Sequence, residues 1–509
     1  MKPHVPPFLC ASLLAVSLFS IALPLSATVT LAPLFRDGAV LQQGRAVPVW
    51  GQADAGEKVR VSFGTQSLET KSNAQGHWMV KLAPLAINAT PAELVVTGTN
   101  TLRVSDVLVG EVWLCSGQSN MAWTFKTLKI DPPAAPAVND PLLRHFKIPN
   151  VCSPTPLDTM PGDWQAVSET NAADISAVAY FFGRELRTRL KVPVGLINSS
   201  WGGSQIESWM SASAIAANPV GDKVINSWKQ ILSDYPAALK AHETQLAKWN
   251  AEKAAASAAG QPFKKRQPRA PIGEDSNRQP SSIYNAMINP IIPAAFRGVI
   301  WYQGETNAAR FDEYRELFPA MITQWRSDFE QPELPFYFVQ LANLERTADT
   351  SGRQWAFQRE AQTAALKLSA TGMAVTIDIG DPANIHPKNK HDVGQRLAAL
   401  ALTQVYQLKT PANGPRFARI ESANHALRVH FTHADGLIAG SSGVTGFEIA
   451  GVDQIFQEAE ARIDGTTVIV SSSKVPSPVA VRYAFKNNPA ASLHNADGLP
   501  AEPFRSDKW

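Results

Sequence analysis

Between residues 106 and 412 the chain alternates short apolar segments with helical segments, and this alternation constrains the fold more than any other feature. The apolar segments have the length of strands: Asp106–Cys115, Val192–Asn198, Arg297–Trp301, Pro335–Leu341 and Ala374–Ile379. The segments between them show helical periodicity: Ile175–Leu190, Glu313–Phe329, Arg353–Leu368 and Asp392–Tyr406. Such alternation predicts an α/β fold with three layers, in which helices cover both faces of a mostly parallel sheet.

Both flanks of this α/β region are rich in predicted strands. Segments such as Lys58–Phe63 and Ala426–Phe431 alternate apolar and polar residues between turn signals. Within the α/β region, Val224–Ala259 is rich in Ala, Lys, Glu and Gln, which favour a helix, and a basic, proline-containing stretch follows. We therefore expect these units: an N-terminal β-rich domain at 28–105, an α/β core at 106–223 and 283–412, a helical insertion with its linker at 224–282, and a C-terminal β-rich domain at 413–509.

The first 27 residues have the pattern of an export signal. Lys2 provides a positive charge, Phe8–Leu23 is apolar, and Leu25-Ser26-Ala27 is a small-residue cleavage site. We expect cleavage after Ala27 and a periplasmic or secreted protein; an uncleaved anchor is the alternative. No other stretch is long and apolar enough to span a membrane, so no membrane association is expected after cleavage.

Charge and cysteine content exclude several classes of partner and cofactor. The chain has 47 Lys and Arg against 44 Asp and Glu, a net charge of +3, which gives no electrostatic case for nucleic acid. Cys10 would leave with the signal, and Cys115 and Cys152 remain. An oxidising compartment would permit one bond between these two, although sequence cannot show their distance. No Cys/His cluster has the short spacing of a zinc site.

Four polar segments follow predicted strands of the α/β region. They are Gly117-Gln-Ser-Asn-Met121, Trp201-Gly-Gly-Ser-Gln-Ile-Glu-Ser-Trp209, Trp301-Tyr-Gln-Gly-Glu-Thr-Asn307 and Ile385-His-Pro387. Each alone has an ordinary interpretation, as a helix cap, a tight turn, a polar strand end or a loop histidine. Because ligands gather beyond the carboxyl ends of parallel strands, the four together indicate one site. A hydroxyl, a glycine loop, an amide with a carboxylate and an imidazole are the groups of serine-dependent acyl transfer.

In combination these segments resemble the sialate O-acetylesterase-like branch of the SGNH hydrolases. Further matching segments are Tyr284-Asn-Ala-Met-Ile-Asn-Pro290, Trp325-Arg326 and Val393-Gly-Gln-Arg-Leu397. The resemblance extends over about residues 28–509, because members of the family often carry β-rich flanks. It implies an SGNH-type three-layer fold and an esterase that acts on acetylated sugars and needs neither a metal nor an organic cofactor. It also implies roles for individual residues.

By this resemblance, Ser119 is the nucleophile and His386 is its general base. The oxyanion donors are the Ser119 N–H, a glycine N–H, for which Gly203 is favoured over its neighbour, and the Gln303 side chain. Asn120 braces the serine turn. With an ordinary imidazole pKa of about 6.5, His386 predicts that activity falls toward acid pH, within about pH 5 to 8.

The third member of a catalytic triad does not follow from the motifs. SGNH enzymes usually place an aspartate three residues before the histidine, and this chain has Ala383 there. Glu305 is the best substitute, Asp381 is the second and a backbone carbonyl is the third. We therefore expect a Glu305 carboxylate oxygen within hydrogen-bond reach of the His386 ring.

The motifs leave the sugar open. Trp123, Trp201, Trp209 and Trp301 lie in or near the motif loops and favour a neutral plant cell-wall polysaccharide such as xyloglucan or xylan. A sialate esterase would offer an arginine to the substrate carboxylate. The alternatives are a sialate O-acetylesterase, a peptidase or lipase, and a carbohydrate-binding protein without activity. The oligomeric state is not indicated.

Overall fold

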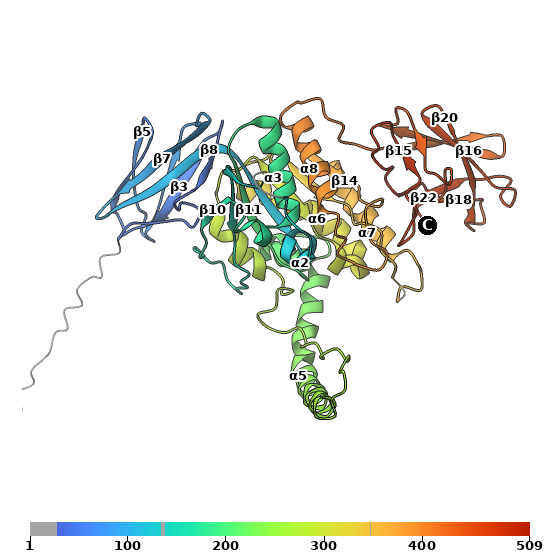
Figure 1. Ribbon diagram of the computed structural model, residues 1–509, viewed down its shortest axis with the longest axis horizontal. Helices are drawn as coiled ribbons and strands as arrows, with labels where there is room; N and C mark the ends of the chain where they lie inside the picture. Colours follow the sequence, from blue (N-terminus) through green and yellow to red (C-terminus); the bar gives the residue numbers. More distant parts are fainter. Residues whose placement is uncertain (1–27, 134–137, 347) are drawn as a thin grey trace, which may run out of the picture.

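The computed structural model describes residues 28–133, 138–346 and 348–509, so the expected signal segment lies outside the described residues. Three parts lie in a row: an N-terminal β unit, a central α/β core and a C-terminal β unit (Figure 1). A long helix projects from the core. No helix in the described ranges combines the length and the apolar character needed to cross a bilayer.

The core is built on a mixed sheet whose strands are mostly parallel. Its order is β10 (Trp164–Val167), β9 (Asp140–Lys147), β11 (Val194–Ser200), β8 (Thr101–Gly117), β12 (Gly298–Tyr302), β13 (Phe336–Val339) and β14 (Thr371–Ala374). Only β10 at the edge is antiparallel to its neighbour in this row. The expected α/β class is confirmed, although the sequence pattern missed β9 and β10.

The two faces of the sheet are buried against different helices, which explains why its strands are apolar without alternation. On one face, Trp113 and Ile300 belong to a core with α3 (Ala177–Leu190) and α8 (Lys390–Gln404). On the other face, Leu114 and Val299 belong to a core with α6 (Phe311–Asp328), which packs on α7 (Gln354–Thr363). Each strand therefore buries successive residues on opposite faces.

The strand expected at Ala374–Ile379 is wrong in position. It is β14, Thr371–Ala374, and the chain leaves the sheet at Val375. Polar contacts hold this exit: Arg396 donates to the Val375 carbonyl at 2.6 Å and pairs with Asp378. The apolar pattern could not show that the residues after Ala374 make polar contacts with side chains such as Arg396, instead of pairing with a neighbouring strand.

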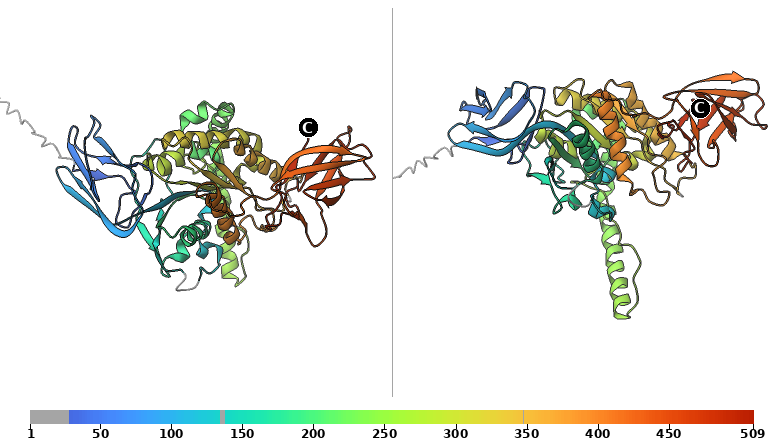
Figure 2. Two further views of the ribbon diagram at one scale, coloured as in Figure 1. Left: turned by 90° about the horizontal axis from the view of Figure 1, so that it is seen from above. Right: turned by 45° about the horizontal axis from the view of Figure 1, so that its top comes forward.

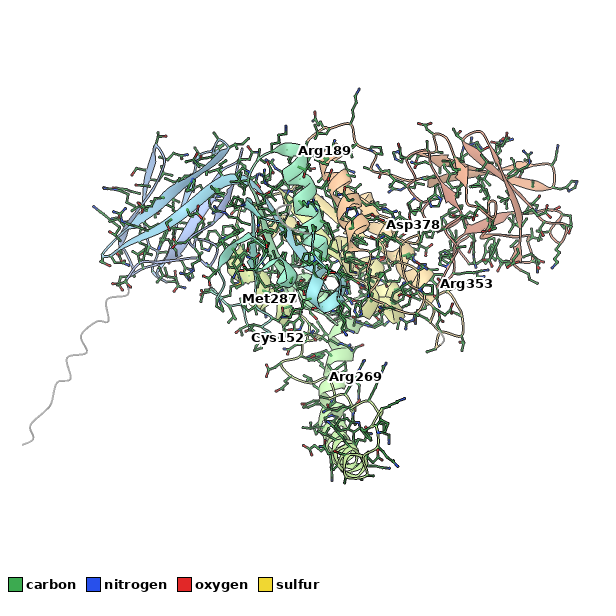
Figure 3. All side chains as sticks on the ribbon, viewed as in Figure 1. Cys152, Arg189, Arg269, Met287, Arg353 and Asp378 are labelled. Carbon is green, nitrogen blue, oxygen red and sulfur yellow. The ribbon has the colours of Figure 1, made fainter. Side chains whose placement is uncertain are left out.

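The cysteines lie on opposite faces of the sheet. Cys115 is buried in the core beneath α3 and α8. Cys152, which is labelled in Figure 3, packs against the core on the other face. Both are free thiols. The single bond considered from the sequence is therefore absent.

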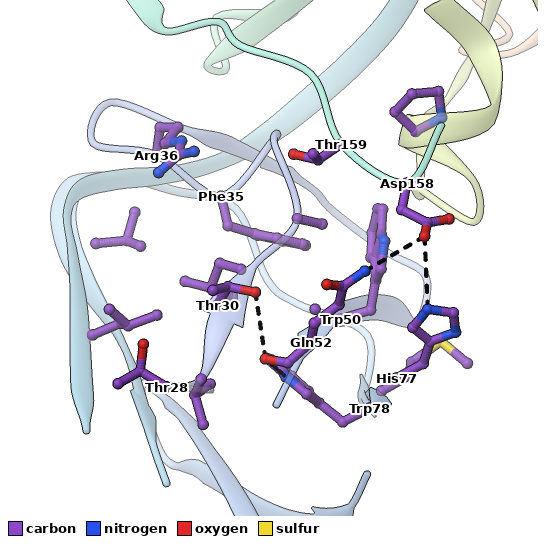
Figure 4. A pocket seen from close by; sticks show the side chains of 18 of the residues that line it. Thr28, Thr30, Phe35, Arg36, Trp50, Gln52, His77, Trp78, Asp158 and Thr159 are labelled. Atoms are coloured by element: carbon purple, nitrogen blue, oxygen red, sulfur yellow. Dashed lines mark hydrogen bonds and ion pairs between the residues drawn. The ribbon is translucent and has the colours of Figure 1, made fainter. Parts of the chain in front are cut away.

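The N-terminal β unit is fused to the core through β8. The first part of β8 pairs antiparallel with β7 (Asn88–Thr97), and its last residues pair with β11 and β12. The other strands of the unit are β1 (Thr30–Leu31), β2 (Val40–Gln42), β3 (Val47–Gln52), β4 (Lys58–Phe63), β5 (Gln66–Lys71) and β6 (His77–Leu82). Where unit and core meet, Gln52, His77 and Asp158 line a cavity of about 1180 Å³ (Figure 4).

The C-terminal β unit has its own hydrophobic core. One sheet contains β15 (Arg416–Ala423), β16 (Ala426–Thr432), β21 (Thr467–Ser471) and β20 (Glu460–Asp464). The second contains β19 (Gln457–Glu458), β18 (Phe447–Ala450), β22 (Ala480–Tyr483) and β24 (Phe504–Arg505), and β17 (Ile438–Ala439) pairs with β23 (Leu493–His494). The buried Arg359 guanidinium joins this unit to the α/β core, since it donates to the carbonyls of Leu341 and Asn487.

The projecting helix is α5 (Gly221–Ala258), which follows the short α4 (Ala212–Ala216). Only Gly221 and Val224 of α5 are buried. The chain after α5 returns along the helix, where Trp249 Nε1 donates to the Lys265 carbonyl at 2.9 Å and the Trp249 ring meets Phe263 edge to face (Figure 2). The helix and the irregular segment that returns along it together form a projecting arm (the α5 arm, residues 221–282).

Candidate active site

Four motif loops leave the sheet at one level. In the strand register, Gly117 pairs with both Ser200 and Tyr302, and Ala374 lies at the same level through β13. β8 is the strand at which chain connections change direction, with β11 on one side and β12 on the other. Ser119, two residues beyond the end of β8, therefore sits at the topological switch point, where open α/β sheets bind ligands.

Ser119 begins a short helix, α1 (Ser119–Ala122), and is buried. Gly117 before it has φ +133°, and a Cβ there would overlap the Tyr302 backbone. The Gln118 N–H donates to the Tyr302 carbonyl at 2.9 Å. A glycine is thus required for the close approach of β8 and β12 that presents the Ser119 hydroxyl at the sheet edge.

The His386 ring meets this hydroxyl. His386 Nε2 lies 2.9 Å from Ser119 Oγ. The imidazole stacks on Trp123, which follows α1, with ring centroids 3.5 Å apart and planes 23° from parallel. The backbone N–H of His386 donates to Asn384 Oδ1 at 2.9 Å. The serine and histidine selected from the sequence are therefore in contact, although 267 residues separate them.

Neither candidate carboxylate holds the imidazole. Glu305 Oε1 accepts from Asn120 Nδ2, and its Oε2 has no partner in the described residues. Asp381 Oδ1 accepts from the Ala383 N–H at 2.9 Å. The expected hydrogen bond from Glu305 to His386 is wrong, because Glu305 lies behind Asn120. Among described side chains, the contact at the site is a serine–histidine pair, and the ring is held by stacking on Trp123.

Burial changes the ionisation of His386. Removal from water, together with the nearby Lys390 ammonium, lowers the pKa of His386 from 6.5 to about 4. The imidazole is therefore neutral and able to accept a proton across the whole range from pH 5 to 8. A pKa of about 4 moves the expected loss of activity to a lower pH than an ordinary histidine would give.

The glycine loop after β11 passes beside Ser119. Gly202 is so close that a Cβ on it would lie 3.2 Å from Ser119 Cβ, and Gly203 has φ +77°. The α5 arm holds the carbonyls of both glycines, since Asn277 Nδ2 donates to Gly202 at 2.9 Å and Arg278 Nε donates to Gly203 at 3.1 Å. The N–H groups of Ser119 and Gly203 donate to no other part of the described chain. They are available to an oxygen of a ligand.

The expected role of Gln303 does not fit its contacts. Gln303 is fully buried, and its Nε2 donates to Asn307 Oδ1 at 2.7 Å and to the Ser204 carbonyl at 3.4 Å. Its donor is therefore used to brace the loop after β11. Asn307 extends this bracing, because its Oδ1 also accepts from the Ile206 N–H at 3.0 Å.

The sequence argument missed Lys390, the first residue of α8. Its Nζ lies 2.5 Å from Asn120 Oδ1, so it contacts the residue that follows Ser119. Burial lowers the pKa of Lys390 to about 7 and raises the pKa of the Glu305 carboxyl. A lysine that begins a helix ordinarily lies at the surface, and its sequence position four residues after His386 was the only available signal.

The four tryptophans of the motif loops have different positions. Trp209 and Trp301 are fully buried and pack edge to face with each other at 5.6 Å. Trp123 and Trp201 are half-buried. Only these two can offer a face to a sugar.

In the described ranges, no group of three His, Cys, Asp or Glu side chains could hold a metal ion.

Comparisons with known proteins match this chain to carbohydrate esterases. The family "Carbohydrate esterase, sialic acid-specific acetylesterase" matches residues 268–403. A solved structure from Xanthomonas citri, described as a novel carbohydrate acetylesterase, is 39% identical and superposes with a TM-score of 0.79 over 95% of this chain and 100% of that chain. Sialate O-acetylesterase from Rattus norvegicus is 29% identical over 90% of each chain. The Homo sapiens sialate O-acetylesterase is 28% identical over 93% of this chain and 91% of its own.

Proposed function

Since the chain belongs to the carbohydrate acetylesterases related to sialate O-acetylesterase, and is thus a carboxylic ester hydrolase, we propose that it removes acetyl groups from sugars with Ser119 and His386. One observation carries this proposal. The Ser119 hydroxyl lies 2.9 Å from an imidazole nitrogen, at a sheet edge beside a glycine loop, and the N–H groups of Ser119 and Gly203 have no acceptor among the described residues. This is the arrangement that acyl transfer requires.

That geometry supports the following steps. Ser119 Oγ attacks the acetyl carbonyl carbon while His386 Nε2 accepts the hydroxyl proton. The Ser119 and Gly203 N–H groups donate to the oxygen that becomes negative. The C–O bond to the sugar breaks, the sugar oxygen takes the proton from His386, and an acetyl group remains on Ser119. A water molecule then attacks this ester while His386 Nε2 accepts its proton. The bond from the acetyl carbon to Ser119 Oγ breaks, Oγ takes the proton back from His386, and acetate leaves.

The core is proposed to be an SGNH-type three-layer unit, and the domain boundaries expected from the sequence stay a proposal with it. Four motif loops at one level of a mixed sheet support the assignment. The chain departs from the SGNH pattern three residues before the histidine, where it has Ala383 in place of the usual aspartate. His386 would then be oriented by Trp123 and by the backbone around it, so the site is better described as a dyad.

We propose a neutral, acetylated plant cell-wall polysaccharide such as xyloglucan or xylan as the substrate. The half-buried faces of Trp123 and Trp201 beside the Ser119–His386 pair support this choice, because sugar rings stack on aromatic planes. Only two of the four tryptophans that favoured a neutral polysaccharide remain as support, since Trp209 and Trp301 are buried in the core.

A second candidate substrate is an acetylated sialic acid, and Arg278 favours it. Its Nε is committed to the Gly203 carbonyl at 3.1 Å, whereas neither Nη donates to another described residue. The half-buried guanidinium could therefore pair with a substrate carboxylate beside the proposed oxyanion site. The similarity to mammalian sialate O-acetylesterases points in the same direction.

Acetate release from acetylated xyloglucan, xylan, pectin and sialic acid tests the proposal and separates these candidates. We expect release from at least one neutral polysaccharide. No release from any acetylated sugar by the folded protein would favour a carbohydrate-binding protein without activity. Arg278→Met adds a second readout: if a sialate carboxylate binds Arg278, the ratio of kcat/KM on acetyl sialate to that on a small neutral acetate ester falls at least about tenfold.

Export is also proposed, and it rests on the pattern of the first 27 residues. Expression of the full chain in a bacterial host, followed by N-terminal sequencing, tests it. A mature protein that begins at Thr28 and is found outside the cytoplasm is the expected outcome. An intact N-terminus in the membrane fraction would contradict it.

A further inference from the structure

Lys390 makes a contact that the proposed reaction does not use directly. It is fully buried, and its Nζ lies 2.5 Å from Asn120 Oδ1 and 5.2 Å from the centre of the Tyr302 ring. Burial of a lysine carries a large desolvation cost unless specific partners offset it. Its partner here is the side chain immediately after the nucleophile.

Asn120 uses both ends of its amide. Its Nδ2 donates to Glu305 Oε1 and, at 3.0 Å, to the Ile385 carbonyl, while its Oδ1 accepts from Lys390. Ile385 precedes His386 in the chain, so one amide connects the serine turn to the histidine loop. A donor on one side and an acceptor on the other allow only one orientation of this amide.

We propose that Lys390 is a positioning residue, which fixes Asn120 against Glu305 and thereby holds the Ser119 turn in register with the His386 loop. The inference rests on the proposed esterase function and deepens it. Lys390 follows His386 by four residues in the chain, and among the described residues its side chain contacts Asn120 and Tyr302, not Ser119 or His386. Its effect on the reacting groups therefore passes through Asn120. The Lys390–Asn120–Glu305 relay thus supplies part of the order that an aspartate at position 383 would otherwise provide.

The charges around the relay give it a measurable signature. The groups that face Lys390 are Glu305 from the loop after β12, Tyr302 from β12 itself and His386 from the loop before α8. The Lys390 ammonium lowers the pKa of His386 through its charge, in addition to the larger effect of burial. Removal of the cation should therefore raise the pKa of His386.

The test compares Lys390→Met with Lys388→Met, which removes an exposed lysine two residues from His386. For Lys390→Met we expect kcat to fall about 10- to 100-fold with KM nearly unchanged, because positioning is lost and substrate contacts are not. The pKa of His386, followed by NMR titration and assigned with His386→Asn, should rise by about half a unit. Lys388→Met should change neither quantity.

A double variant separates positioning from simple charge balance. Lys390→Met alone leaves the Glu305 carboxyl buried opposite no cation, so it could fail to fold; Lys390→Met/Glu305→Gln removes both charges. We expect the double variant to melt near the wild-type temperature and to keep the low kcat. Recovery of wild-type kcat in the double variant would overturn the proposal, as would an unchanged pKa of His386 in a folded Lys390 variant.

The titration also distinguishes the two proposals. It measures the imidazole directly and does not depend on turnover. If the wild-type protein releases no acetate while the pKa of His386 still responds to Lys390→Met, the esterase proposal fails and the contact between Lys390 and the histidine loop stands.

Discussion

The Ser119 turn and the His386 loop meet at one site, but they are held in different ways. The turn continues directly from β8, between β11 and β12, and its backbone is fixed by the sheet register. The loop lies beyond β14, is half exposed, and is held by stacking on Trp123 and by the Ile385 carbonyl. The proposed nucleophile is thus placed by strand pairing, whereas the proposed base is placed by a few side chains.

The largest loss of activity should come from a substitution in the Ser119 turn, which the sheet holds in place. Ser119→Ala removes the attacking oxygen and little volume, so kcat/KM on a chromogenic acetate ester should fall at least about 1000-fold while the melting temperature stays within about 2 °C. Turnover within about tenfold of wild type would show that another residue is the nucleophile.

The orientation of His386 should depend on its stacking partner Trp123. Trp123→Ala removes the ring that holds His386, and we expect kcat to fall about 10- to 100-fold because the imidazole loses its orientation. Trp249→Ala on the α5 arm is the matched control, as Trp249 is also half-buried and lies outside the site. Equal activities in the two variants would contradict the role of the stack.

The glycine loop offers a test of the backbone donors. Gly203→Ala places an alanine at φ +77°, where nothing within 4 Å obstructs a Cβ, so any change reflects backbone conformation. We expect about 10-fold lower kcat as the N–H turns away, and a loss of about 1 kcal/mol in stability. Gly260→Ala, at φ +67° in equally open surroundings, should lose similar stability and no activity.

The pH dependence reports on the burial of the base. With a pKa of about 4, His386 stays neutral down to that pH, so kcat/KM should be flat from about pH 5 to 8 and fall near pH 4. The unfolded chain protonates His386 at about pH 6.5, which favours unfolding below that value. Stability should therefore decline between about pH 6.5 and 4 in a circular dichroism titration, and His386→Asn should reduce this decline.

The smallest effect is expected for the acid that the motifs suggested as an alternative. Asp381→Asn keeps an acceptor for the Ala383 N–H, and kcat/KM should stay within about threefold of wild type. Glu305→Ala should cost more, about tenfold, because Asn120 loses its acceptor. The reverse order in steady-state kinetics would mean that Asp381 moves onto the ring during catalysis.

Strand–helix alternation and the motif segments were enough to predict the α/β class, the β-rich flanks and the four loops that meet at the site. These features depend on local periodicity and on the rule that parallel strands present their carboxyl ends at one edge. The Ser119–His386 contact could be anticipated in the same way, because each residue follows a strand of one sheet.

The tertiary structure alone decided the chemistry of the individual side chains. Gln303 and Glu305 are both polar residues after β12, yet one braces Asn307 and the other binds Asn120. Lys390 has the sequence signature of a surface residue, and only packing beneath the serine turn gives it a pKa of about 7. Periodicity places a residue on a strand or a loop, whereas burial and the neighbours brought from distant segments determine its hydrogen bonds and its charge.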